Sequence, residues 1–268
     1  MAEALPPPPL SLGPGRALSR VLVTAAVGLV AAGFFSIEGD PSAEAKEAKT
    51  GKRASAKSSA KPGAKDTFEY GCRVQKPQVF LERRTFVTKG LLDGGKHTRA
   101  IRYFAERYGH ADDEVTMRYT SQSARSQVRI VKFMGLPLSI HSKVAPALAC
   151  VEKRLTATCT GRSHYKPLAI GGLRAANTYR GAEISNHLFG IAIDIDPDKN
   201  PCCGCVDPWP SSPLCKNREQ QRSVYERTAL PKCWVRAFER FGFDWLGHDD
   251  LEDTMHFEFL GDPDRIKR

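Results

Sequence analysis

The sequence predicts an α+β fold in which a small antiparallel sheet is flanked by helices. Two observations lead to this class. Apolar residues have helical spacing in residues 97–108 and 141–155, and they alternate with small or charged residues in residues 190–195 and 255–259. With 268 residues, the chain is long enough to bury a substantial core. Its apolar and charged fractions, 41% and 26%, are those of a globular protein.

The amino-terminal quarter of the chain is expected to lie outside the folded part. Residues 1–20 are rich in proline, and residues 38–65 form a basic linker that cannot bury enough apolar surface to fold. Between them, residues 21–37 form an apolar run that follows Arg16 and Arg20. This pattern is typical of a signal peptide or of a membrane anchor, and the sequence leaves both open. Either one exports the chain that follows it, because the positive charges stay in the cytoplasm.

The net charge of +10 does not indicate a nucleic-acid-binding protein. Half of the excess lies in residues 41–65, where seven Lys and Arg residues stand against two Glu. No basic cluster interleaved with aromatic residues occurs elsewhere, as a nucleic-acid platform would require. We therefore expect no nucleic-acid partner.

Residues 66–134 are expected to form an amino-terminal extension of the globular region. The helix predicted at residues 97–108 ends before Gly109, a common helix stop. Alternation at Val128 and Ile130 indicates strands near the end of this extension.

Residues 135–268 are expected to form the principal domain. It begins with the helix predicted over residues 141–155, which carries its apolar residues on one face. A second helical stretch over residues 225–241 is expected to break at Pro231, because proline cannot continue a helix. The two short strands of this domain lie on either side of that stretch.

Each of these two strands is predicted to present polar side chains on one face. In the first, the isoleucines share one face and Asp194 lies on the other. In the second, the Met and Phe residues face the core, while His256 and Glu258 face a cleft. His187 precedes the first strand, so the turn between them can place its imidazole beside Asp194.

The eight cysteines all follow the apolar segment and are interpreted first as disulfides, as expected for an exported protein. A thiolate metal site is the alternative for the cluster of Cys202, Cys203, Cys205 and Cys215. The sequence does not give the pairing.

His187, Asp194 and His256 supply two imidazoles and one carboxylate, with a further carboxylate at Asp253. A catalytic zinc takes three nitrogen or oxygen ligands and keeps its fourth position for water. A carboxylate close to that water can take its proton. These residue types therefore predict a hydrolytic zinc site.

The pattern S-x-H-x-x-G-x-A-x-D, followed downstream by D-x-x-H, resembles a family of zinc peptidases. The family comprises D-alanyl-D-alanine carboxypeptidases and dipeptidases together with L-alanyl-D-glutamate endopeptidases. Every signature position is filled, by Ser185, His187, Gly190, Ala192, Asp194, Asp253 and His256. The resemblance covers about residues 135–262 and implies the fold that these peptidases share with hedgehog-type signalling domains.

The resemblance also implies a role for each site residue. His187, Asp194 and His256 would bind one catalytic zinc ion, and Asp253 would be the general base. The family places an arginine upstream of the first motif to stabilise the oxyanion. Arg174 and Arg180 both qualify, and spacing does not decide between them. The residues expected to orient the site or contact substrate are Ser185, Glu258 and His248.

The function implied is that of an exported zinc peptidase acting on stem peptides of bacterial peptidoglycan. It would work in the periplasm or cell envelope, held at the inner membrane if the apolar segment is retained. The bond cut would be D-Ala-D-Ala or L-Ala-D-Glu, and Asp253 favours the latter because many dipeptide-cleaving relatives have Glu there. The alternative is a non-catalytic wall-binding module with a structural zinc. Asp253 argues against this alternative, since a structural zinc needs no base.

Overall fold

The computed structural model describes residues 66–179, 182–206, 209–216 and 223–267. The proline-rich start, the apolar segment and the basic linker predicted before residue 66 lie outside the described residues. Within the described ranges, no helix is both long enough and apolar enough to cross a membrane.

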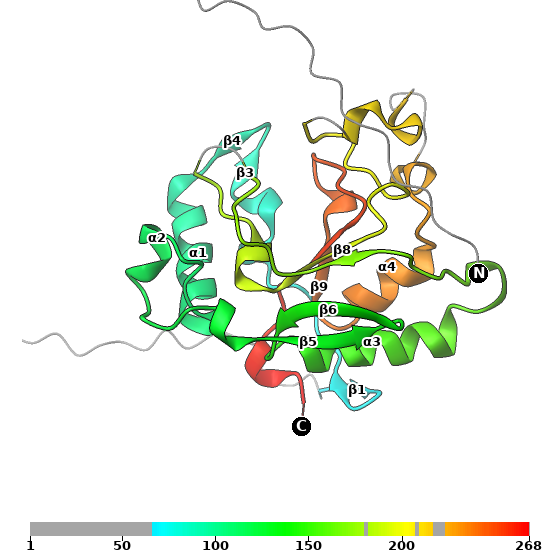
Figure 1. Cartoon of the computed structure of the whole chain (residues 1–268), viewed down its shortest axis with the longest axis horizontal. Coiled ribbons are helices and arrows are strands. Elements are labelled where there is room, and N and C mark those ends of the chain that lie inside the picture. The colour runs from blue at the N-terminus through cyan, green and yellow to red at the C-terminus, as the bar shows by residue number, and fades with distance from the viewer. Residues whose placement is uncertain (1–65, 180–181, 207–208, 217–222, 268) are drawn as a thin grey trace, which may run out of the picture. The chain divides into compact units, whose positions relative to one another are not determined.

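The described chain combines helices with small antiparallel sheets, which confirms the predicted α+β class at this level (Figure 1). The helices are α1 (Gly94–Tyr108), α2 (Glu114–Met117), α3 (Ala145–Thr158) and α4 (Lys232–Glu239). The largest sheet has the strand order β7 (Ile170–Gly171), β8 (Ala192–Ile195), β10 (His256–Phe259) and β9 (Phe243–Trp245). Three two-stranded hairpins accompany it: β1 (Phe68–Glu69) with β2 (Cys72–Arg73), β3 (Val87–Thr88) with β4 (Leu91–Leu92), and β5 (Val128–Phe133) with β6 (Leu136–His141).

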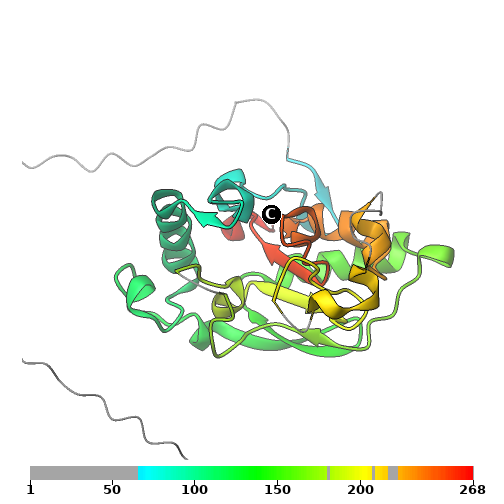
Figure 2. The same ribbon diagram turned by 90° about the horizontal axis from the view of Figure 1, so that it is seen from above.

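The helix α1 begins three residues earlier than predicted, because the Asp93 carboxylate accepts a hydrogen bond from the Lys96 N–H at 3.0 Å and caps it. It ends at Tyr108, before Gly109 as predicted, and the φ of Gly109 is 101°. Figures 1 and 2 show α1 well apart from α3, beside the segment that leads into β8. The ring of Phe104 on α1 packs against Phe189, with centroids 5.6 Å apart. The amino-terminal extension thus contacts the short helix that carries His187.

The hairpin of β5 and β6 corrects the helix predicted over residues 141–155. Residues 136–141 form a strand, and the helix α3 starts only at Ala145. Pro146 in its first turn suits a helix start, where the missing N–H costs nothing. The short helix α2 was not foreseen either. The boundary expected between residues 134 and 135 lies in the turn of this hairpin, and core residues come from both sides of it.

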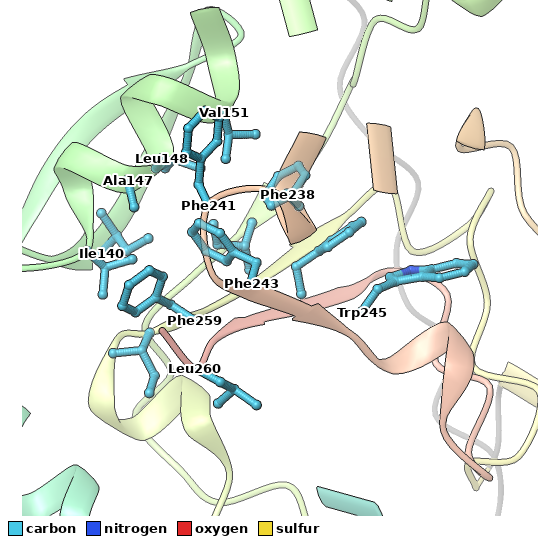
Figure 3. Close-up of a cluster of buried hydrophobic side chains, with 14 of the residues drawn as sticks. Ile140, Ala147, Leu148, Val151, Phe238, Phe241, Phe243, Trp245, Phe259 and Leu260 are labelled. Atoms are coloured by element: carbon cyan, nitrogen blue, oxygen red, sulfur yellow. The ribbon is translucent and has the colours of Figure 1, made fainter. Parts of the chain in front are cut away.

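The part of the core drawn in Figure 3 lies between one face of the large sheet and the helices α3 and α4, and the core extends to buried residues of α1. The helical stretch predicted over residues 225–241 is indeed broken at Pro231, the residue that precedes α4. Phe238 of α4 stacks on Phe257 of β10, with centroids 4.1 Å apart. Removing a fully buried ring of this kind costs about 3–5 kcal/mol. The strand that carries His256 therefore rests on a closely packed base.

All eight cysteines form disulfides, which confirms the first interpretation of them. The four pairs are Cys72–Cys150, Cys159–Cys233, Cys202–Cys205 and Cys203–Cys215. The first joins β2 to α3, and the second joins the end of α3 to the start of α4. Since no free thiol remains among the eight, the alternative thiolate metal site is not formed.

His141 allows a test of the fold that does not depend on the polar face of the sheet. Its ring is fully buried, its Nε2 lies 3.0 Å from the Tyr108 carbonyl oxygen, and its Nδ1 accepts the Lys143 N–H. Burial lowers the pKa of His141 to about 4. The pKa of an exposed imidazole is about 6.5. The neutral ring therefore stabilises the fold fully above about pH 6.5, and this contribution is lost as the pH falls toward 4.

We expect His141→Gln to flatten the pH dependence of the free energy of unfolding between pH 6.5 and 4. The change in the free energy of unfolding between pH 6.5 and 4 should be smaller than in the wild type by about 3 kcal/mol at most, because glutamine takes up no proton. Urea denaturation at half-unit pH steps measures it. Parallel pH profiles for the two proteins would show that His141 does not control acid stability.

Candidate metal centre and catalytic site

The register of β8 and β10 brings two predicted metal ligands together. His256 lies directly opposite Asp194, and Phe257 lies opposite Ile193. Side chains alternate between the two faces of a strand, so the imidazole and the carboxylate share the polar face while the apolar pair faces the core. The predicted division of each strand into a core face and a site face is therefore present in the structure.

His187 reaches the same face from the short 3-10 helix Asn186–Phe189. The Ser185 hydroxyl oxygen caps this helix by accepting the His187 N–H at 3.4 Å. Gly190 ends it in the left-handed conformation, with φ at 67°. A Cβ there would also lie 2.8 Å from Val128 Cγ2, so glycine is needed for both reasons. Ser185 and Gly190 thus set the turn that delivers His187 to β8.

The three predicted ligands are buried and close together, with exposed fractions of 1% for His187, 3% for Asp194 and 2% for His256. His187 Nε2 lies 3.2 Å from His256 Nδ1 and 3.2 Å from Asp194 Oδ2, and His256 Nδ1 lies 3.0 Å from Asp194 Oδ1. Tetrahedral zinc with bonds of about 2.0–2.1 Å places its ligand atoms about 3.3 Å apart. The donor atoms and their spacing therefore fit a single zinc ion.

The other nitrogen of each histidine is held by an acceptor. His187 Nδ1 lies 2.6 Å from the Gly172 carbonyl oxygen, and His256 Nε2 lies 3.3 Å from Glu258 Oε2. The Asn186 amide donates to the same Glu258 oxygen at 2.8 Å. Such partners fix the tautomer and orientation of histidines that bind metals. Glu258 thus contacts His256 as expected.

Asp253 lies beside the three ligands and borders a cavity that His187, Asp194 and His256 also line. It is 8% exposed, and its Oδ1 atom has no hydrogen-bond partner in the described part of the chain. Burial raises the pKa of Asp253 to about 7. A buried carboxylate oxygen without a partner and with a raised pKa is suited to accept and return a proton.

The cysteine-rich loop, which is closed by the disulfides Cys202–Cys205 and Cys203–Cys215, holds the segment of Asp253 in place. Cys202 forms an antiparallel bridge with Asp253, and the Gly204 N–H donates to the Leu251 carbonyl oxygen at 2.7 Å. A Cβ at Gly204 would lie 2.6 Å from that oxygen, so only glycine allows the two backbones to approach so closely. Thr254 is joined to Pro201 by its N–H and its hydroxyl group.

Charge is unevenly shared among the three ligands. Burial alone would raise the pKa of Asp194, but the charges and hydrogen bonds of His187 and His256 hold it well below its usual range. Burial lowers the pKa of His187. For His256, burial is outweighed by hydrogen bonds to Asp194 and Glu258, which raise its pKa to about 10. The ligand set thus contains an anionic carboxylate, which favours a metal cation between the three side chains.

A cavity of about 320 Å³ opens beside these residues. Arg174 lines it and forms an ion pair with Asp194, and Arg174 Nη1 donates to the Thr178 hydroxyl oxygen at 3.1 Å. Arg180, the other arginine considered, lies outside the described residues. His248 is not among the residues around this cavity, and its ring packs against Trp245 and Tyr225 instead.

Several residues around the cavity were not foreseen as part of the site. Tyr179, Val206 and Trp209 contribute to its wall. Asn186 was also missed, although its position beside His187 was a signal for it. The position of the cysteine-rich loop between the two motifs was the signal for Val206 and Trp209.

Residues 178–259 match the model of a protein family described as D-alanyl-D-alanine carboxypeptidase. The resemblance predicted from the motifs is confirmed over these residues, whereas it was expected over about residues 135–262. The matched segment contains His187, Asp194, Asp253 and His256, and it ends with the strand β10. The match therefore supports a peptidase and covers the region around the site. No curated protein and no solved structure matches the chain.

Proposed function

We propose that this protein is a zinc-dependent peptidase that hydrolyses peptide bonds in the stem peptides of bacterial peptidoglycan. One observation carries the proposal: three buried ligands at tetrahedral spacing lie beside a buried carboxylate oxygen that has no hydrogen-bond partner among the described residues. The family match to a carboxypeptidase supports the substrate class. A structural zinc site alone would give no reason to bury Asp253 with its Oδ1 atom unpartnered in the part of the chain that the structure describes.

In this proposal, His187, Asp194 and His256 would hold the metal through Nε2, a carboxylate oxygen and Nδ1. A zinc ion bound there would supply Lewis acidity and lower the pKa of a water molecule. Asp253 takes the proton of the attacking water and delivers it to the leaving amine. Arg174 lies at the cavity wall, where its guanidinium group can stabilise negative charge on the carbonyl oxygen.

The setting that we propose is the periplasm or cell envelope, on a fold of the hedgehog and D-Ala-D-Ala peptidase type. Four disulfides agree with an oxidising compartment. Residues 21–37 would serve as the signal or the inner-membrane anchor.

The test is mass spectrometry of purified muropeptides after incubation with the full-length chain, with and without a zinc chelator. We expect products that disappear with the chelator and return when zinc is added back. Loss of a terminal alanine identifies a carboxypeptidase, and cleavage after L-Ala identifies an endopeptidase. If zinc is bound but no product forms, the peptidase is contradicted and the wall-binding module is favoured.

A further inference from the structure

Arg83 joins the amino-terminal extension to two segments of the candidate site. Its side chain is buried, with only 9% of the residue exposed. Nε and Nη2 donate to the two carboxylate oxygens of Glu183 at 2.6 and 3.2 Å, and Nη1 donates to Asp249 Oδ1 at 2.7 Å. A planar guanidinium group suits this arrangement, because its donors can serve two carboxylates at once.

Glu183 lies in the turn that leads to the zinc ligand His187. The Asn177 side chain holds this turn on both sides, since it donates to the Glu183 carbonyl oxygen and accepts the Ser185 N–H. Ser185 in turn caps the helix of His187. A shift of Glu183 is therefore passed on to that helix.

Asp249 lies in the turn that leads to the proposed base. Its Oδ1 atom also accepts the Leu251 N–H at 3.0 Å, and its carbonyl oxygen accepts the Glu252 N–H at 2.9 Å. The next residue, Asp253, donates its N–H to the Leu246 carbonyl oxygen. The carboxylate bound by Arg83 thus anchors the turn from which Asp253 extends.

We propose that Arg83 is a positioning residue that clamps the Glu183 turn to the Asp249 turn and so fixes Asp253 relative to His187. The effect on catalysis rests on the proposed function. The clamp assigns a role to the amino-terminal extension, which lies outside the residues that the family model matches. Without the guanidinium group, the two partly buried carboxylates would repel each other and the turns would separate.

The experiment compares Arg83→Gln, Arg83→Lys and the triple variant R83Q/E183Q/D249N in the full-length protein. Arg84→Gln is the matched control, because Arg84 adjoins Arg83 but is 49% exposed and pairs with its neighbour Glu82. Amide hydrogen exchange is measured over residues 182–189, 246–255 and 97–108, together with kcat and KM on muropeptides.

For Arg83→Gln we expect at least tenfold faster exchange in the first two segments and unchanged exchange in α1. We also expect kcat to fall at least tenfold, with KM within threefold of wild type. Arg83→Lys keeps the positive charge but cannot donate to both carboxylates in the same geometry. Its exchange rates and kcat should lie between those of the wild type and Arg83→Gln. The triple variant, which removes the repulsion, should regain exchange protection in both turns, and Arg84→Gln should behave as wild type.

Unchanged exchange in both turns of Arg83→Gln would overturn the clamp. So would faster exchange throughout, α1 included, because it would mean that Arg83 only supports overall stability. If Arg83→Gln does not fold, the lysine and triple variants decide by the same criteria. If the wild type cleaves no muropeptide, the proposed function fails, but the exchange data still test the clamp.

Discussion

Replacing Asp253 by asparagine should lower kcat by about 10²- to 10⁴-fold, which is the range that general acid–base groups contribute. The variant should still bind one zinc ion. Asparagine keeps the size of the side chain but cannot take a proton. The proposed zinc ligands are His187, Asp194 and His256, so removing the charge of Asp253 should not release the metal. Muropeptide turnover and the zinc content of the purified variant measure the two effects.

Asp250→Asn is the matched control, because this exposed carboxylate lies in the same turn and outside the cavity wall. It should keep kcat within about twofold, as expected for a surface substitution away from the chemistry. An Asp253→Asn variant that retains full turnover would rule out Asp253 as the base. A variant that loses zinc would show instead that Asp253 acts on the metal.

His256→Ala should weaken zinc binding by more than about 100-fold and abolish turnover. Loss of a partner of a ligand typically costs 10–100-fold in metal affinity, so loss of the ligand itself should cost more. The variant also leaves Asp194, Asp253 and Glu258 near one another without the imidazole between them. Competition with a chromophoric chelator gives the affinity, and thermal unfolding shows whether the fold survives.

His248→Ala serves as the control for this variant, since its imidazole lies outside the residues that surround the cavity. We expect its zinc affinity and turnover to match those of the wild type. If it instead lost turnover with zinc retained, the substrate contact inferred from the sequence would hold. Stoichiometric zinc in His256→Ala would place the metal elsewhere.

The site was largely predictable because its signals are local. Alternation with a period of two residues assigns Asp194 and His256 to strand faces without any knowledge of the fold. The start of α3 was placed too early, because the apolar spacing of residues 141–155 does not reveal that residues 136–141 pair with β5. Only Pro146 marked the true start.

Contacts between distant residues left no such signal. Arg83 binds partners 100 and 166 residues further along the chain. Nothing near Arg83 in the sequence distinguishes it from Arg84. The disulfide pairing was hidden for the same reason, since Cys72 and Cys150 are separated by 78 residues.

The backbone β-bridge between Cys202 and Asp253 has a consequence for how the protein matures. The loop that supports the proposed base is closed by two disulfides, so this part of the site should become complete only after oxidation. If the chain is exported as proposed, we expect new chains to gain turnover only after their thiols are consumed, which pulse-labelling with thiol trapping can follow. The proposed peptidase would then be inactive until its folding is finished.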